Sequence, residues 1–103
     1  QYNSKACMAR FADIARTMGL PGATDKQLTN SLVDALREMN RRLGIALSFK
    51  EHGVPEDLFL STRDFVCENA VLDPCTGANP RPCDVEDMKK VLTCCYYGED
   101  VNF

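Results

Sequence analysis

The segment 73–83 carries the densest set of side chains that could do chemistry. Within seven residues it holds a thiol, a hydroxyl, an amide and a guanidinium, supplied by Cys75, Thr76, Asn79 and Arg81. Its prolines limit the freedom of the backbone, so these groups would be held in a defined arrangement. Long irregular loops in small domains often carry function, which favours a functional role here. A stiff inter-helix connector, in which Thr76 and Asn79 satisfy turn backbone groups, explains the same residues equally well.

Elsewhere the titratable residues form no recognisable site. His52 is the only histidine, and its place just before Gly53 is typical of a helix C-terminus, where the dipole favours a cation. The acidic residues are spread over predicted helix surfaces, and no pair stands out as an acid–base couple. No G-x-G-x-x-G or G-x-x-x-x-G-K-[ST] segment is present, so no phosphate-binding loop of these types is expected. The sequence therefore predicts no catalytic residue and no metal ligand in this chain.

The six cysteines lie at positions 7, 67, 75, 83, 94 and 95. An even number in a short chain is compatible with a disulfide framework. However, no pair has the C-x2-C spacing of a zinc site, and the adjacent Cys94 and Cys95 would form a strained bridge. We therefore expect reduced cysteines that behave as small buried apolar groups, with a disulfide-linked protein as the alternative.

The elements that must position these groups are helices throughout. Apolar residues recur at spacings of three and four over residues 6–18, 24–43, 55–70 and 84–97, and a short helical turn is expected at 48–52. No segment alternates as a half-buried strand does. The predicted fold is all-α: one small domain with four main helices and one short helical turn in a bundle-like packing.

Capping residues and apolar stripes refine this prediction. Thr24 with Gln27, and Ser48 with Glu51, have the spacing of a capping box. Three prolines and a glycine make 73–83 an extended loop, and 99–103 form a tail. The four stripes expected to be buried are Cys7, Phe11, Ile14, Ala15 and Met18; Leu28, Leu32, Ala35, Leu36, Met39 and Leu43; Leu58, Phe59, Thr62, Phe65, Val66, Asn69 and Ala70; and Val85, Met88, Val91, Leu92, Cys95 and Tyr96.

The composition excludes several classes of protein. With 45% apolar and 26% charged residues, it is typical of a folded globular domain and not of a disordered chain. A net charge of −3 argues against a nucleic-acid partner. No apolar run approaches the ~20 residues that span a bilayer, and no signal peptide is visible, so no membrane partner is expected. Because the chain begins at Gln1 and enters helical patterning almost at once, we expect an excerpt from a longer protein.

A family resemblance is carried by the loop motif Cys75-Thr76-Gly77-Ala78-Asn79-Pro80-Arg81. It resembles a motif near the C-terminus of the iron-dependent (group III) alcohol dehydrogenases. The alanine at its fourth position is closest to the bifunctional aldehyde–alcohol dehydrogenases of fermentative organisms. The resemblance covers essentially the whole chain, through Met8-Ala9-Arg10-Phe11-Ala12-Asp13-Ile14-Ala15, Met18-Gly19-Leu20, Leu43-Gly44-Ile45, Asp57-Leu58-Phe59 and Cys95-Tyr96-Tyr97-Gly98.

This resemblance implies that residues 1–103 are the C-terminal segment of the family's helical domain. The intact enzyme would be NAD-dependent, contain iron or zinc, and interconvert aldehydes and alcohols by hydride transfer. In the family, the metal is held by one aspartate and three histidines, and these residues and the nucleotide site lie upstream of the matched segment. This chain alone would therefore bind no cofactor and be inactive, and in the intact enzyme it would help to close the substrate cleft.

The resemblance also assigns roles to the loop and to the partners. Cys75 would line the substrate channel, Arg81 would anchor the loop, and the residues that shape it would be Thr76, Gly77, Asn79 and Pro80. The partners would be the remainder of the parent chain and a small alcohol or aldehyde, in the cytoplasm. The bifunctional branch forms helical filaments, so a homo-oligomer or filament is a further expectation. The alternative from another class is a stand-alone secreted, disulfide-linked helical binding module for an apolar ligand.

Overall fold

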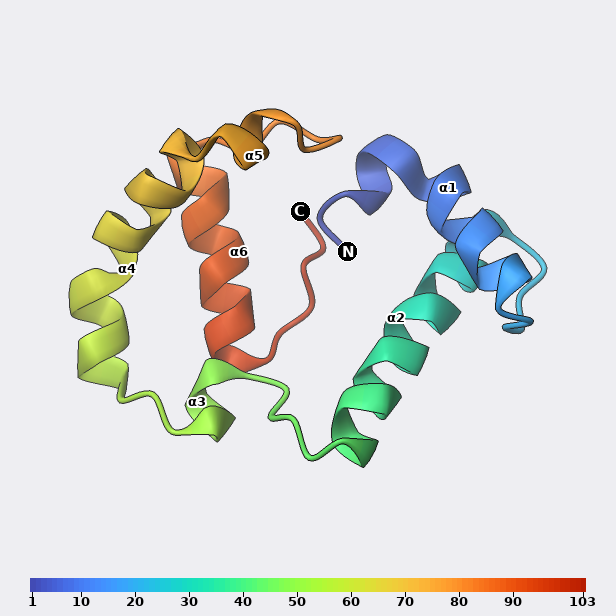
Figure 1. Ribbon diagram of the computed structural model, residues 1–103, viewed down its shortest axis with the longest axis horizontal. Helices are drawn as coiled ribbons and strands as arrows, with labels where there is room; N and C mark the ends of the chain where they lie inside the picture. Colours follow the sequence, from blue (N-terminus) through green and yellow to red (C-terminus); the bar gives the residue numbers. More distant parts are fainter. The chain divides into compact units, whose positions relative to one another are not determined.

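The computed structural model describes all 103 residues as helices joined by loops (Figure 1). It contains no strand, which confirms the predicted all-α class. Four helices are long and two are single turns: α1 (Ser4–Thr17), α2 (Asp25–Arg42), α3 (Phe49–His52), α4 (Glu56–Leu72), α5 (Pro74–Gly77) and α6 (Val85–Tyr97). The chain forms two compact units, Gln1–Ile45 and Ala46–Phe103, where the sequence predicted one small domain. None of the helices combines the length and the apolarity that a membrane crossing requires.

The helix ends follow the capping residues that the sequence contains. At the start of α2, the Thr24 hydroxyl accepts from the Gln27 N–H and the Gln27 side chain accepts from the Thr24 N–H, which confirms the capping box. At the start of α3, the Ser48 hydroxyl accepts from the Glu51 N–H. Gly98 ends α6 with a φ of 76°, a left-handed conformation that favours glycine.

The prediction of an extended loop over the whole of 73–83 was wrong at its beginning. Residues Pro74–Gly77 form the helical turn α5. Proline fits the first position of a helix, where its missing N–H costs nothing, and the Asp73 carboxylate caps the turn by accepting from the Cys75 N–H at 2.8 Å. The proline that favoured an extended chain therefore starts a helical turn at this position.

In the unit Gln1–Ile45, α1 packs against the first half of α2. The buried core consists of Ala12, Ala15, Leu28 and Leu32, with Phe11 and Leu20 packed around it. The predicted stripe of α2 is therefore confirmed at Leu28 and Leu32. Further along the same stripe it is wrong, because Leu36, Met39 and Leu43 are 48%, 49% and 66% exposed.

The face that α1 buries was predicted only in part: Ala15 is fully buried and Phe11 packs against the core, as expected. The sequence pattern favoured Ile14 and Met18, which are about half exposed, whereas the neighbouring Ala12 is fully buried. Small side chains let two helix backbones approach closely, and the buried Thr29 hydroxyl of α2 donates to the Met8 carbonyl oxygen of α1 at 3.5 Å. The close contact through Ala12 and Ala15 therefore turns the buried face of α1 away from Ile14 and Met18.

In the unit Ala46–Phe103, α4 and α6 lie side by side and α3 packs against α6 (Figure 1). The rings of Phe59 in α4 and Tyr96 in α6 stack with centroids 4.0 Å apart. Tyr96 is buried, and its hydroxyl donates to the Val54 carbonyl oxygen at 3.0 Å. Tyr97 packs edge-on against both rings and donates its hydroxyl hydrogen to the Glu56 carboxylate, which lowers the pKa of Glu56. This aromatic cluster joins α4 to α6.

The buried faces of α4 and α6 were predicted only in part. Phe59 is buried as expected, together with Cys67, which the prediction left out. The remaining stripe of α4 is largely exposed, at Leu58, Thr62, Phe65, Val66 and Asn69. In α6, Tyr96 is buried as predicted but Cys95 is exposed. Apolar residues cover most of the circumference of α4, so the spacing alone could not choose between two faces.

Candidate functional site

The loop that carries the predicted site residues is held by hydrogen bonds to nearby backbone. The Thr76 hydroxyl donates to the Ala70 carbonyl oxygen at 2.5 Å, and the Asn79 amide donates to the Arg81 carbonyl oxygen at 2.6 Å. Such bonds satisfy turn backbone groups, as expected for a connector. The exposed residues among those singled out in the sequence are Cys75, Gly77 and Pro80.

Arg81 connects this loop to α6 and to the C-terminal tail. Its guanidinium donates to the Phe103 main-chain oxygen at 2.8 Å and lies 4.0 Å from the Asp87 carboxylate. The tail runs back along α6 (Figure 1), where the Lys90 ammonium lies 5.6 Å from the centre of the Phe103 ring. The thiol of Cys94 faces the Asp100 carbonyl oxygen at 3.9 Å. These contacts hold residues 99–103 against the helix.

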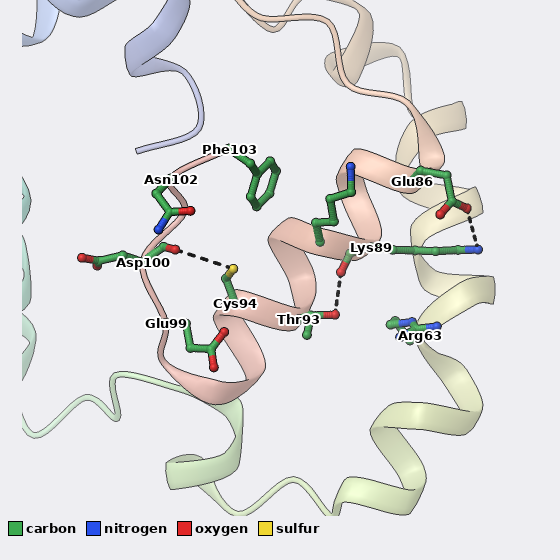
Figure 2. A pocket seen from close by; sticks show the side chains of 10 residues that line it. Arg63, Glu86, Lys89, Thr93, Cys94, Glu99, Asp100, Asn102 and Phe103 are labelled. Atoms are coloured by element: carbon green, nitrogen blue, oxygen red, sulfur yellow. Dashed lines mark hydrogen bonds and ion pairs between the residues drawn. The ribbon is translucent and has the colours of Figure 1, made fainter.

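A pocket of about 660 Å³ lies beside α6, between that helix and the tail (Figure 2). Its lining consists of Arg63 from α4, Glu86, Lys89, Lys90, Thr93 and Cys94 from α6, and Glu99, Asp100, Asn102 and Phe103 from the tail. None of the site residues predicted in the sequence lines this pocket. Arg81 takes part only indirectly, because it holds the end of the tail that closes one side.

The cations that line the pocket are paired with carboxylates in or beside it. Each cation has a carboxylate partner: Arg63 with Asp64, Lys89 with Asp64 and Glu86, and Lys90 with Asp87. The hydrogen bond with Glu86, followed by the one with Asp64, raises the pKa of Lys89. The positive charge needed to attract a phosphate is therefore already engaged within the protein.

Cys94 is the one thiol in the pocket, and its surroundings do not activate it. Burial raises the pKa of Cys94, which disfavours the thiolate that reacts. The lining includes no histidine, since His52 lies on α3. The pocket therefore lacks a nucleophile–base pair.

All six cysteines are unpaired in the structure, and they differ widely in exposure. The expectation that they are buried is right only for Cys67, since Cys75 and Cys95 are exposed. We expect native-state alkylation to modify Cys75 first and Cys67 last. Access explains most of this order, and burial also raises the pKa of Cys67, so that less thiolate is present at neutral pH. Pulsed labelling with N-ethylmaleimide and peptide mass spectrometry would measure the six rates.

A matched variant identifies the fast site. Cys75→Ser is expected to remove the fastest labelling phase and to leave the slowest one unchanged. Labelling of Cys67 as fast as that of Cys75 in the native protein would contradict the packing of α4 against α6.

The family of this chain follows from a comparison of its sequence with known families. The family described as Fe-containing alcohol dehydrogenase, C-terminal, matches residues 1–96. The chain belongs to this family. The resemblance seen in the sequence is thus confirmed, and the unpaired cysteines likewise give no support to the alternative of a disulfide-linked binding module.

The individual relatives of this Fe-containing alcohol dehydrogenase domain are several times longer than the chain itself. It is 39% identical over its whole length to an NADPH-dependent butanol dehydrogenase of Clostridium saccharobutylicum. It is 38% identical over 97% of its length to the bifunctional aldehyde-alcohol dehydrogenase of Escherichia coli strain K12, and 33% identical over 85% to the lactaldehyde reductase of that strain. The chain spans 26%, 11% and 22% of these three proteins, respectively.

The residues of this Fe-containing alcohol dehydrogenase domain do not fit an iron ion. No three histidine, cysteine, aspartate or glutamate side chains lie together in a group that could hold a metal. The single histidine, His52, is exposed at the end of α3. The ligand set that the family's description implies is therefore not supplied by these 103 residues.

Sequence reasoning missed the residues that line the pocket of this Fe-containing alcohol dehydrogenase domain. The tail residues Asp100, Asn102 and Phe103 followed the end of a helix and showed no pattern of their own. One of the contacts that position them is the bond from Arg81 to Phe103, which lies 22 residues further along the chain. No local signal could have linked the two segments, although Arg81 itself stood out as the guanidinium of the loop.

Proposed function

We propose that this chain is the C-terminal part of an iron-containing alcohol dehydrogenase that uses a nicotinamide cofactor. The reaction is the transfer of a hydride between the nicotinamide and the carbonyl carbon of a short aldehyde, with the alcohol as the reduced product. The match over residues 1–96 carries this proposal. The names of the three relatives support it, because each refers to an alcohol or an aldehyde.

The proposed role of the chain is to close the substrate cleft of the intact enzyme. Cys75 is assigned to the lining of the substrate channel, and its exposure on α5 leaves its thiol available for that position. The residues assigned to shape the loop are Thr76, Gly77, Asn79 and Pro80, and Arg81 is assigned to anchor it. The hydrogen bonds of Thr76, Asn79 and Arg81 support these assignments.

The isolated chain is expected to be inactive. Purified chain supplied with ferrous iron, ethanol and NAD or NADP is expected to form no reduced nicotinamide above background. The intact protein is expected to turn over with at least one cofactor. NAD is our first choice, and NADP must be compared because a 39% identical relative is NADPH-dependent by name. Turnover by the chain alone, or none by the intact protein with either cofactor, would reject the proposal.

A lining role for Cys75 makes the effect of substitution depend on side-chain size. In the intact enzyme, Cys75→Ala is expected to change kcat/KM for butyraldehyde little. Cys75→Phe is expected to lower kcat/KM by about tenfold or more, because a bulky ring would narrow the channel. Cys95→Phe is the matched control, since Cys95 is also exposed but lies outside the loop. Equal losses at both positions, or none at Cys75, would remove Cys75 from the channel.

The partners and the location belong to the same proposal. We assign the remainder of the parent chain as the principal partner, a small alcohol or aldehyde as the substrate, and the cytoplasm as the location. The lengths of the relatives support the first of these, because this region forms 11–26% of each of the three. Assembly into a homo-oligomer or filament stays a prediction for the intact enzyme.

A further inference from the structure

Helix α4 has a second apolar face that nothing in its own unit covers. Its buried side chains, Phe59 and Cys67, belong to the face that packs with α6. Almost opposite them on the helix lie Leu58, Phe65 and Leu72, which are 51%, 70% and 81% exposed. Large apolar side chains gathered in one row on a surface are typical of an interaction site.

The spacing of this row indicates what shape would cover it. Leu58, Phe65 and Leu72 are seven residues apart, so the row runs nearly parallel to the helix axis for about 21 Å. A row of this kind matches a second helix that crosses at a small angle, as in helix bundles. A small ligand would contact only part of a row of this length.

The charges beside the row indicate the chemistry of that second helix. Asp57 and Glu68 lie on the same edge of the row, both are exposed, and neither has an ionic partner. The other edge carries the neutral Thr62 and Asn69. A second copy of this helix would bring no positive charge to the acidic edge. A helix with lysine or arginine beside its apolar row would bring positive charge to this edge.

We propose that the row Leu58–Phe65–Leu72 is covered, in the intact dehydrogenase, by an amphipathic helix from the part of the enzyme outside these 103 residues. That helix lies lengthwise along α4, and its basic residues face Asp57 and Glu68. This inference rests on the proposed function, since it takes the chain to be part of a longer enzyme. This region forms 11–26% of the three relatives compared, so the rest of such a chain provides room for the helix.

Hydroxyl-radical footprinting of the intact enzyme tests the cover directly. Phe65 is expected to be oxidised about tenfold more slowly than its exposed fraction of 70% would give, and at a rate close to that of the buried Phe59. A rate for Phe65 like that of a freely exposed phenylalanine would overturn the inference. Protection that disappears on dilution to a single copy would mean that a second copy covers the row, and would overturn it too.

Substitutions in the intact enzyme test the apolar row and the charges separately. Phe65→Glu is expected to lower Tm by about 5 °C or more, because it places a carboxylate against an apolar row. Leu60→Glu is the matched control, since Leu60 is 53% exposed but off the row. Glu68→Lys is expected to lower Tm more than Glu68→Gln. Equal effects of Phe65→Glu and Leu60→Glu, or no difference between the two Glu68 variants, would contradict the proposed partner.

Activity measurements separate this inference from the proposed function. An intact protein in which Phe65 is protected but no aldehyde is reduced with NADH or NADPH would reject the dehydrogenase and retain the covering helix. An active enzyme in which Phe65 is freely oxidised would reject the covering helix alone. A gene product of only 103 residues would reject both.

Discussion

Replacing Tyr96 with alanine is expected to unfold the unit Ala46–Phe103. The ring of Tyr96 is 1% exposed and stacks on Phe59, and its hydroxyl supplies a hydrogen bond to the Val54 carbonyl oxygen. Truncation of a large buried aromatic residue costs about 3–5 kcal/mol. A unit of this size has a total free energy of unfolding of only about 3–9 kcal/mol, so the substitution removes most of it.

Hydrogen exchange read by mass spectrometry would measure this loss. Amides of α4 and α6 are expected to lose their protection in Tyr96→Ala. The matched control is Tyr96→Phe, which retains the stacked ring and removes only the hydrogen bond to Val54. Its expected cost is about 1–2 kcal/mol, so α4 and α6 should stay protected. Equal protection in the alanine variant and the unaltered protein would show that the aromatic cluster does not hold the unit together.

The ends of the helices could be predicted because they depend on neighbouring residues. The capping box of Thr24 and Gln27, the cap at Ser48 and the stop at Gly98 involve groups three residues apart or a single backbone conformation. Local signals of this kind are present in the sequence whatever the rest of the chain does. The fold class followed from them and from the apolar spacing.

The buried faces could not be predicted equally well, because they depend on which helix approaches. In α4 the predicted stripe was right at Phe59 but wrong at Leu58 and Phe65, because α6 packs on the face that Phe59 shares with Cys67. Both faces of α4 are apolar, so the spacing of its apolar residues was compatible with burial of either face. A covering helix along Leu58, Phe65 and Leu72 would make each face of α4 a packing surface with its own partner.

The candidate site was likewise predictable in its residue types but not in its long-range contacts. Cys75 and Arg81 could be singled out because their chemistry stands out within a loop, but their partners could not be identified. The bond from Arg81 to Phe103 brings together residues that are 22 positions apart, and it is one of the contacts that hold the tail beside the pocket. This chain offers no group of ligands for the iron that the family's description implies.

Replacing Leu28 with alanine is expected to destabilise the unit Gln1–Ile45 more than any other single truncation on α2. Leu28 is 3% exposed and packs with Ala12 and Ala15 of α1. Removing its side chain leaves a cavity, since the neighbouring alanines are too small to fill it, and such truncations cost about 2–5 kcal/mol. Urea denaturation followed by the far-ultraviolet circular dichroism signal would measure the change in the free energy of unfolding.

Leu43 provides the matched control, because it lies on the same stripe of α2 as Leu28 but is 66% exposed. Leu43→Ala removes the same atoms from the same kind of helix, and alanine has the higher helix propensity, so its expected cost is within about 0.5 kcal/mol of zero. The contrast between the two leucines therefore measures the packing of α1 and not the helix itself. Similar costs at both positions would mean that the whole stripe is covered in solution, and that α1 is not the only element that packs on α2.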